Sequence, residues 1–234
     1  MNSRVSVIIP TLNEEKYIST ILSDLSQQSL PPHEIIVVDG TSHDHTTSII
    51  KQFNNVQLLE TLPQVAEQRN RGAANASGDT LIFLDADTHV TSSFIEKIVT
   101  EFEKKNYSIA IPCYVPINSK PLINGFFIFF NALFYVFQKV SPSGAGCGIM
   151  VKKEIFDTYG KFNREYTYDD IELIRRVSRK GKYGILPVTV YVSDRRFKKY
   201  GLVYMISLYS VLSLLFFFNQ FKLANKVKYP FGNF

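Results

Sequence analysis

The chain has few of the residues and patterns on which several protein classes depend. It has two cysteines, Cys113 and Cys147, whose spacing fits neither a disulfide framework nor a set of metal ligands. We therefore expect both to be small buried apolar residues of a protein in a reducing compartment. The chain also lacks a dense basic helix and any interleaving of basic with aromatic residues, so no nucleic-acid partner is expected.

The start of the chain lacks the pattern of a secretory signal peptide, because a strand pattern begins almost at once. Of the 234 residues, 45% are hydrophobic, which is enough to bury a full core in one or two domains. The formal net charge is +5 and the isoelectric point is near 9.0. A modest basic excess of this kind suits phosphate-bearing ligands and anionic membrane surfaces.

The first half of the chain alternates between strand and helix patterns. Buried strands are predicted at 5–9, stopped by Pro10, and at 34–38, 56–59 and 80–84. Helices are predicted at 18–25, around 49–53, at 64–76, and from a capping box of Ser93 and Glu96 to about Lys104. This alternation predicts an α/β fold with a mostly parallel sheet and helices on both faces. In such folds, ligands bind beyond the carboxyl ends of the strands.

Acidic residues follow three of the predicted strands. Asp85 and Asp87 end the strand at 80–84, and their side chains project the same way because side chains alternate along a strand. Two carboxylates held so close need a cation, and oxygen ligands suit magnesium or manganese. Glu14 and Asp39 fall at the ends of two further strands, so all four converge on one edge of the sheet. Taken singly, the Asp85-Ala86-Asp87 motif also fits a solvated loop, and Glu14 and Asp39 also fit helix capping.

The turn after the first strand contains no glycine. It reads Pro10-Thr11-Leu12-Asn13-Glu14-Glu15, whereas a dinucleotide-binding fold needs glycines there so that backbone can approach a pyrophosphate. A diphosphate must therefore be held another way, and a metal ion on Asp85 and Asp87 would supply it.

Three segments together carry a resemblance to a known family. They are Val5 to Glu15, Val37-Val38-Asp39-Gly40 and Phe83-Leu84-Asp85-Ala86-Asp87. In order and spacing they resemble the family 2 glycosyltransferases of the GT-A fold, over roughly residues 1 to 200. The resemblance implies a nucleotide-sugar-binding half at 1–118 and an acceptor-binding half of the same domain at 119–200, and the apolar run that follows predicts a membrane-associated C-terminal segment at 201–234.

The resemblance also implies roles for single residues. Those expected to bind the nucleotide-sugar are Pro10, Thr11, Glu14, Asp39, Arg69, Asn70, Asp85 and Ala86. Among them, Asp39 would hydrogen-bond the base, and Arg69 or Asn70 would lie near the nucleotide. Asp85 would face the ribose and metal-bound water, while Asp87 would bind Mn²⁺ or Mg²⁺ directly. An ordinary solvated helix face also explains Arg69.

Two later motifs supply the expected catalytic residues. Tyr168 to Arg176 opens with more acid than a helix cap requires, and the family's second acid in this motif is the general base, here Asp170. Ser193-Asp194-Arg195-Arg196-Phe197 resembles the family's later arginine motif, so Arg196, with Arg195 as the alternate, is expected to reach the diphosphate. Because the chain has no tryptophan, Phe197 takes the place of the aromatic residue that often follows. Helix capping also fits Asp170, and a basic cluster beside a membrane also fits the arginines.

An uncharged apolar segment follows these motifs. Residues 201–218 contain no charge and are at the lower limit for spanning a bilayer. Basic residues flank the segment on both sides, so it fits equally a span and a helix lying in the membrane surface. The phenylalanine-rich stretch at 123–137 is either a second interfacial segment or a core-packing helix. We expect attachment at the cytoplasmic face of the cell membrane, as a peripheral, monotopic or single-span protein.

The resemblance and the motifs together predict an inverting transfer of sugar from a UDP- or GDP-linked donor. The expected acceptor is a glycan, such as one linked to polyprenyl or dolichyl lipid. A sugar-nucleotidyltransferase is an alternative, although it normally needs a glycine- and lysine-rich first loop, where this chain has only Lys16. A membrane-attached nucleotide-sugar-binding protein without catalysis is the other. This non-catalytic alternative is disfavoured by the presence of Asp85, Asp87 and Asp170.

Overall fold

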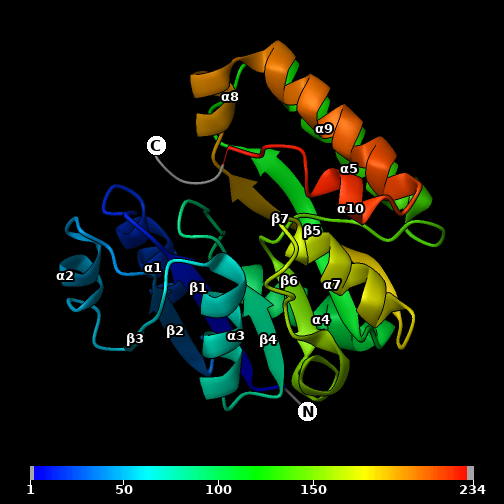
Figure 1. Cartoon of the computed structure of the whole chain (residues 1–234). Helices are drawn as coiled ribbons and strands as arrows, with labels where there is room; N and C mark the ends of the chain where they lie inside the picture. The colour runs from blue at the N-terminus through cyan, green and yellow to red at the C-terminus, as the bar shows by residue number, and fades with distance from the viewer. Residues whose placement is uncertain (1–2, 231–234) are drawn as a thin grey trace.

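A computed structural model of the chain describes residues 3–230. Seven strands form one sheet in the order β3-β2-β1-β4-β6-β5-β7 (Figure 1). Only β6 among these strands runs antiparallel to its neighbours. The predicted α/β class with a mostly parallel sheet is confirmed. The strands are β1 (Val5–Thr11), β2 (Glu34–Asp39), β3 (Val56–Glu60), β4 (Thr80–Phe83), β5 (Ile109–Pro116), β6 (Ile149–Lys152) and β7 (Tyr183–Val192).

The central strands are covered on both faces. Val7 and Ile8 are adjacent in β1, so their side chains point to opposite faces of the sheet, and both are fully buried. Strands buried in this way read as continuous apolar runs, which is why the sequence revealed them clearly. One predicted boundary is wrong, because β1 continues through Pro10 to Thr11. The β4 ladder ends opposite Ile8, so at Pro10 the remaining paired strand is β2, and the missing N–H is tolerated there.

Helices connect the first strands largely as predicted. They are α1 (Ile18–Ser26), α2 (Thr46–Ile50), α3 (Val65–Asn75) and α4 (Phe94–Lys105). The predicted capping box of α4 is wrong. Within the described chain, Ser93 makes no side-chain capping hydrogen bond, and Glu96 instead accepts a hydrogen bond of 2.7 Å from the Ser29 hydroxyl. Glu96 therefore ties α4 to the loop after α1.

Short helical turns lead from β6 to the acidic motif of the second half. They are α6 (Lys153–Ile155) and a π-helical turn (Phe156–Gly160), and the motif itself opens the helix α7 (Asp169–Ser178). Asp169 and Asp170 stand at the start of α7, and the buried apolar face of the helix includes Leu173, Ile174 and Val177. Packing of this face against the main core fixes where the two carboxylates are presented.

A second apolar cluster lies beside the main core. It is built from α5 (Pro121–Phe137), α8 (Arg195–Tyr200), α9 (Leu202–Phe217) and α10 (Phe221–Ala224). Its buried members are Ile123, Tyr168, Phe197, Met205, Leu208, Leu212, Phe216 and Ala224. Figure 1 shows α9 lying along α5 at one end of the molecule. The predicted apolar segment at 201–218 is thus α9, packed on one side against this cluster. Across residues 3–230, no helix combines the length and apolar character needed to cross a membrane.

Candidate active site

Four acidic residues gather where the parallel strands end. Glu14 follows β1, Asp39 ends β2, and Asp85 and Asp87 follow β4. Because β1 lies between β2 and β4 in the sheet, these carboxyl ends are neighbours. The topology therefore forms the predicted acidic edge at the usual binding position of an open α/β sheet.

Arg195 joins two of these acids. Its guanidinium donates two hydrogen bonds to the Glu14 carboxylate, at 2.9 and 2.7 Å, and its Nε lies 3.0 Å from Asp87 Oδ2. The guanidinium also stacks on Tyr17, 5.2 Å from the ring centroid. Burial raises the pKa of Asp87 and of Glu14, and Arg195 opposes this rise in both cases. Arg195 thus supplies the positive charge that two buried carboxylates require.

Arg69 forms a second ionic cluster from the other side. This buried side chain of α3 places Nη2 3.2 Å from Asp85 Oδ1 and Nη1 3.3 Å from Asp169 Oδ1. Its guanidinium also lies 5.1 Å from the ring centroid of Phe162. Gly146 approaches so closely that an added Cβ would come 2.4 Å from Nη2. Arg69 is therefore a buried member of the site and does not belong to a solvated helix face.

The two aspartates that open α7 differ in their surroundings. Asp169 is almost fully buried beside Arg69, and burial raises its pKa to about 7, with Arg69 opposing the rise. Asp170 is half-buried and accepts a hydrogen bond of 2.8 Å from the backbone N–H of Ile171. Burial also raises the pKa of Asp170, again opposed by Arg69. Asp169 thus forms an ion pair, whereas Asp170 is partly exposed and lies near Arg69 and Asp85.

Asp39 is fixed by its own loop. Its carboxylate accepts hydrogen bonds from the backbone N–H and the hydroxyl of Ser42, at 2.7 and 2.5 Å. The Thr11 hydroxyl donates a third hydrogen bond at 3.3 Å. Pro10 and Thr11 form the buried end of β1 beside this carboxylate. Three of the predicted nucleotide-binding residues therefore lie together in one small region.

The other predicted residues occupy distinct places. Arg196 donates a hydrogen bond of 2.9 Å to the Tyr229 hydroxyl and stacks over that ring. Asn70 exchanges two hydrogen bonds of 2.8 Å with the backbone of Phe162, so it links α3 to the loop before α7. Ala86 is buried between the two aspartates of its motif. Of the two adjacent arginines, Arg195, the alternate prediction, is the one that contacts Glu14 and Asp87.

Sequence reasoning gave no role to Asp169. The available signal was the excess of acid at the start of α7, since a helix cap uses only one aspartate. Its partner Arg69 is 100 residues away in sequence, so the pairing depends on how α3 and α7 pack.

Asp85 and Asp87 are the side chains best suited to a divalent cation. Across residues 3–230, no group of three or more histidine, cysteine or acidic residues forms a metal cage. A cage is not required for Mg²⁺, which proteins commonly hold through one or two carboxylates together with substrate phosphates. The donor chemistry of the two aspartates therefore fits a metal ion shared with a diphosphate.

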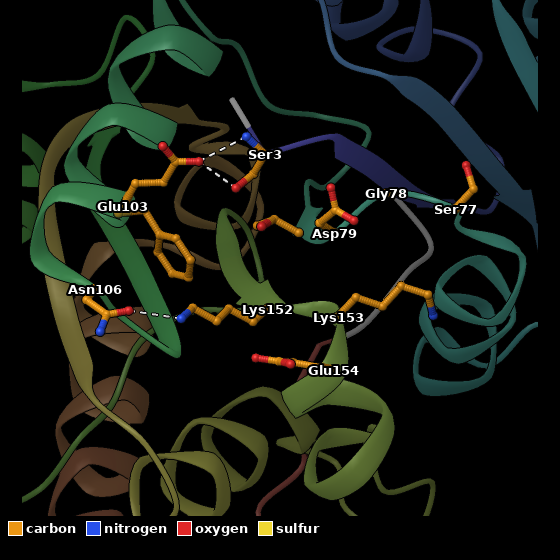
Figure 2. Close-up of a pocket in the computed structure, with 11 residues that line it drawn as sticks. Ser3, Ser77, Gly78, Asp79, Glu103, Asn106, Lys152, Lys153 and Glu154 are labelled. Carbon is orange, nitrogen blue, oxygen red and sulfur yellow. Dashed lines mark hydrogen bonds between the residues drawn. The ribbon is translucent and has the colours of Figure 1, made fainter. Parts of the chain in front are cut away.

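A cavity of about 840 Å³ lies away from these residues. Figure 2 shows its lining, which includes Ser3, Asp79, Glu103, Lys152 and Lys153. Ser3 precedes β1 and Asp79 precedes β4. The cavity is therefore at the amino ends of the parallel strands, opposite the acidic edge, and it does not contribute to the candidate site.

Comparisons with solved structures identify the fold. A mannosyltransferase from Pyrobaculum calidifontis, solved with GDP-Man and Mn²⁺, superposes with a TM-score of 0.76 at 21% identity, covering 98% of this chain and 66% of that one. TarS 1–349 of S. aureus, solved with UDP-GlcNAc, superposes with a TM-score of 0.68 at 18% identity, covering 82% of this chain and 58% of that one. The predicted GT-A-like architecture is therefore confirmed.

Curated sequences match over part of their length. A dolichyl N-acetyl-alpha-D-glucosaminyl phosphate 3-beta-D-2,3-diacetamido-2,3-dideoxy-beta-D-glucuronosyltransferase of Methanococcus voltae is 30% identical over 109 residues, covering 43% of this chain and 34% of that protein. The poly(ribitol-phosphate) beta-N-acetylglucosaminyltransferase TarS of Staphylococcus aureus (strain Mu50) is 34% identical over 101 residues, covering 40% of this chain and 18% of that protein. The matches thus span 34% and 18% of the length of these two relatives.

The family assignment depends on a longer match. The sequence model described as "Glycosyl transferase family 2" matches residues 6–160, which include β1, the Asp85-Ala86-Asp87 motif and Gly146. The chain belongs to glycosyl transferase family 2.

Proposed function

We propose that this glycosyltransferase inverts the anomeric configuration of a sugar that it transfers from a UDP- or GDP-linked donor to a lipid-linked acceptor. The observation that carries the proposal is the convergence of Asp85, Asp87 and Asp170 with two arginines at one edge of the sheet. This set combines groups for a diphosphate with a separate, half-buried carboxylate for proton transfer.

The donor's nucleoside is proposed to lie along the ends of β1 and β2. Asp39 is held rigidly by Ser42 and Thr11 and so presents a fixed acceptor toward a base. Similar structures were solved with UDP-GlcNAc and with GDP-Man, which supports a nucleoside diphosphate sugar without choosing between the two bases.

A divalent ion on Asp85 and Asp87 would neutralise charge that develops on the departing diphosphate. The mannosyltransferase solved with Mn²⁺ supports Mn²⁺ or Mg²⁺ in this role. The protein's own cations for the same anion are Arg195 and Arg196, adjacent on α8. Fixed positive charge at a leaving group lowers the barrier most where water is excluded, as around these largely buried side chains.

Asp170 is proposed to accept the proton of the attacking hydroxyl. Its carboxylate stands beside the Asp85 cluster, and burial raises its pKa, which makes it a better proton acceptor than a solvated aspartate. Attack from the face opposite the diphosphate breaks the anomeric bond as the new one forms, so the configuration inverts. The diphosphate leaves with the electron pair of that bond.

The acceptor is proposed to be a polyprenyl- or dolichyl-linked glycan at the cytoplasmic face of the membrane. The name of the Methanococcus voltae relative specifies a dolichyl-linked sugar phosphate, which supports this acceptor class. The uncharged helix α9 beside the site supports a location at the membrane.

A screen against nucleotide sugars tests the proposal. The purified chain is incubated with UDP- and GDP-linked sugars, with and without Mn²⁺, while thermal stabilisation and release of nucleoside diphosphate are measured. We expect one base to stabilise the protein in a metal-dependent manner, and Asp87→Asn to remove that dependence. Stabilisation that is unaffected by metal would contradict the role of Asp87, and absence of binding to every donor would contradict the proposed function.

A further inference from the structure

Helices α5 and α9 form a two-helix layer with an apolar outer side. Phe126 and Phe130 of α5 contact Tyr209 of α9, with ring centroids 5.9 and 6.3 Å apart. Further along both helices, Phe137 contacts Phe217 at 5.7 Å. The contacts advance in the same direction along both sequences, so the helices run parallel. Figure 1 shows the pair on the outside of the molecule.

The outer side of this layer is unusually apolar. Fourteen of the eighteen large hydrophobic residues that are exposed in the described chain lie between Leu122 and Val140 or between Val203 and Leu223. We call these fourteen residues the α5–α9 surface. Ile128 is 69% exposed and Val203 is 78% exposed. A helix apolar on all sides is normally buried all round, but α9 buries only the side that contains Met205 and Leu208. An exposed patch of this kind marks a binding surface.

The charged residues within the two segments that form the α5–α9 surface are of one sign. Neither 104–153 nor 195–230 contains an aspartate or a glutamate. Seven exposed lysines lie in these segments beside the helices: Lys120, Lys139, Lys198, Lys199, Lys222, Lys226 and Lys228. Of these, Lys198 is paired with Asp194 at 2.7 Å. An apolar surface with a lysine border and no acidic residue within its own segments complements an anionic partner.

We propose that the α5–α9 surface docks the chain on a bilayer of anionic phospholipids, with both helices lying in the headgroup region. Apolar side chains would enter the acyl boundary while the lysines contact phosphate groups, as in interfacial helices generally. A second copy of the chain fits less well. Pairing two such surfaces would bring their lysine borders together without acidic partners from those segments.

The α5–α9 surface belongs to a layer that starts at the same edge of the sheet as the candidate active site. Helix α5 follows the end of β5, and α8 and α9 follow the end of β7. Both strands run in the direction of β4, since each pairing through β6 reverses direction and β7 is parallel to β5. The layer therefore starts from the sheet edge where Asp85 and Asp87 lie. The link between docking and catalysis rests on the proposed function, because a bilayer docked here would present a lipid-linked acceptor to the site.

Vesicle flotation with the full chain tests the docking without donor or acceptor. We expect binding to phosphatidylglycerol-containing vesicles and much weaker binding to pure phosphatidylcholine. Replacing Lys222, Lys226 and Lys228 by glutamine is expected to weaken partition roughly a hundredfold at low salt. The Ile128→Asn, Val203→Asn variant is expected to weaken it about tenfold or more. Circular dichroism establishes that each variant is folded.

Matched variants away from the surface give the controls. Replacing Lys51, Lys97 and Lys105, which are exposed elsewhere, removes the same charge, and Leu62→Asn changes an apolar side chain that is 73% exposed outside the layer. Both are expected to bind vesicles like the parent. Equal loss in the two lysine variants, or no binding to either vesicle, would overturn the proposal. So would a dimer in sedimentation that the Ile128→Asn, Val203→Asn variant abolishes. Sugar transfer to a soluble acceptor is scored separately, so the proposed function can fail or hold independently of docking.

Discussion

Arg195 Nε lies 3.0 Å from Asp87 Oδ2, on the carboxylate expected to bind a metal ion. The rest of the same guanidinium is hydrogen-bonded to Glu14. A buried carboxylate needs a compensating charge, and in this arrangement Arg195 supplies it. A divalent cation at Asp87 must therefore compete with Arg195, unless a diphosphate offers the guanidinium a new partner.

This competition predicts the behaviour of Arg195→Gln. Without the guanidinium, Asp87 and Glu14 lack their positive partner, so we expect Mn²⁺ alone to bind about tenfold more tightly than to the parent. Sugar transfer is expected to fall by about a hundredfold, because a cation for the departing diphosphate is lost. Calorimetric titration with Mn²⁺ in the absence of nucleotide measures the first effect, and steady-state kinetics measures the second.

Lys97→Gln is the control for Arg195→Gln. It removes the same charge from an exposed position on α4, so it should leave both Mn²⁺ binding and transfer unchanged. If Mn²⁺ binds the Arg195→Gln variant no better than the parent, the guanidinium and the metal do not compete for Asp87.

Asp170→Asn separates proton transfer from binding. We expect transfer to fall by about two to four orders of magnitude while donor affinity stays within about twofold, because general base catalysis contributes to the transition state only. Asp169→Asn is the matched variant, since it changes the neighbouring carboxylate that pairs with Arg69. It should alter stability and donor affinity more than Asp170→Asn does. Normal turnover by Asp170→Asn would mean that the acceptor oxygen is already ionised or that another group removes its proton.

The raised pKa of Asp169 predicts a pH dependence of stability. Burial raises this pKa from 3.8 to about 7, so within that window the folded protein retains a proton that the unfolded chain has released. The contribution of Asp169 to the free energy of unfolding therefore falls as pH rises from 3.8 to about 7, and is constant above. Denaturant unfolding across the window should give a shallower downward slope for Asp169→Asn than for the parent. Equal slopes would show that Asp169 titrates as an ordinary aspartate.

The sequence specified the sheet because its strands are buried on both faces. A continuous apolar run such as that of β2 fits a strand that is covered on both faces of a sheet. The alternation of strands with helices along the chain favours parallel pairing, as between β1 and β2. The predicted strand end at Pro10 was wrong because a proline interrupts a strand only where a backbone N–H is needed for pairing. The predicted capping box of Ser93 and Glu96 was wrong because Glu96 accepts a hydrogen bond from Ser29, which is distant in sequence. Such competition between local and tertiary partners cannot be read from spacing alone.

The acidic edge was predictable for the same topological reason, but the pairing of its charges was not. Arg195 and Arg196 are adjacent on the six-residue helix α8, and packing of Phe197 into the second cluster fixes the orientation of that helix. This orientation places Arg195 on Asp87 and Arg196 on Tyr229. The contacts of Phe126 and Phe127 with Phe197, which set this packing, join segments about 70 residues apart. Periodicity gives no information on contacts of this kind.

Gly146→Ala tests whether the position of Arg69 matters for catalysis. An added Cβ would come 2.4 Å from Arg69 Nη2, and the guanidinium, held by Asp85 and Asp169, must move to relieve the clash. We expect donor affinity to fall by about tenfold and the free energy of unfolding to fall by about 1 to 3 kcal/mol. Gly125→Ala is the control, since an added Cβ meets nothing within 4 Å there.

Gly125 lies within helix α5, so Gly125→Ala should leave transfer unchanged and raise stability by about 0.5 to 1 kcal/mol. A double-mutant cycle completes the test of Gly146→Ala. Arg69→Lys removes the clashing planar group, so the Arg69→Lys, Gly146→Ala variant should lose less donor affinity than the two single variants combined. Strict additivity would mean that the methyl group acts through the backbone of the 143–148 loop and not through Arg69.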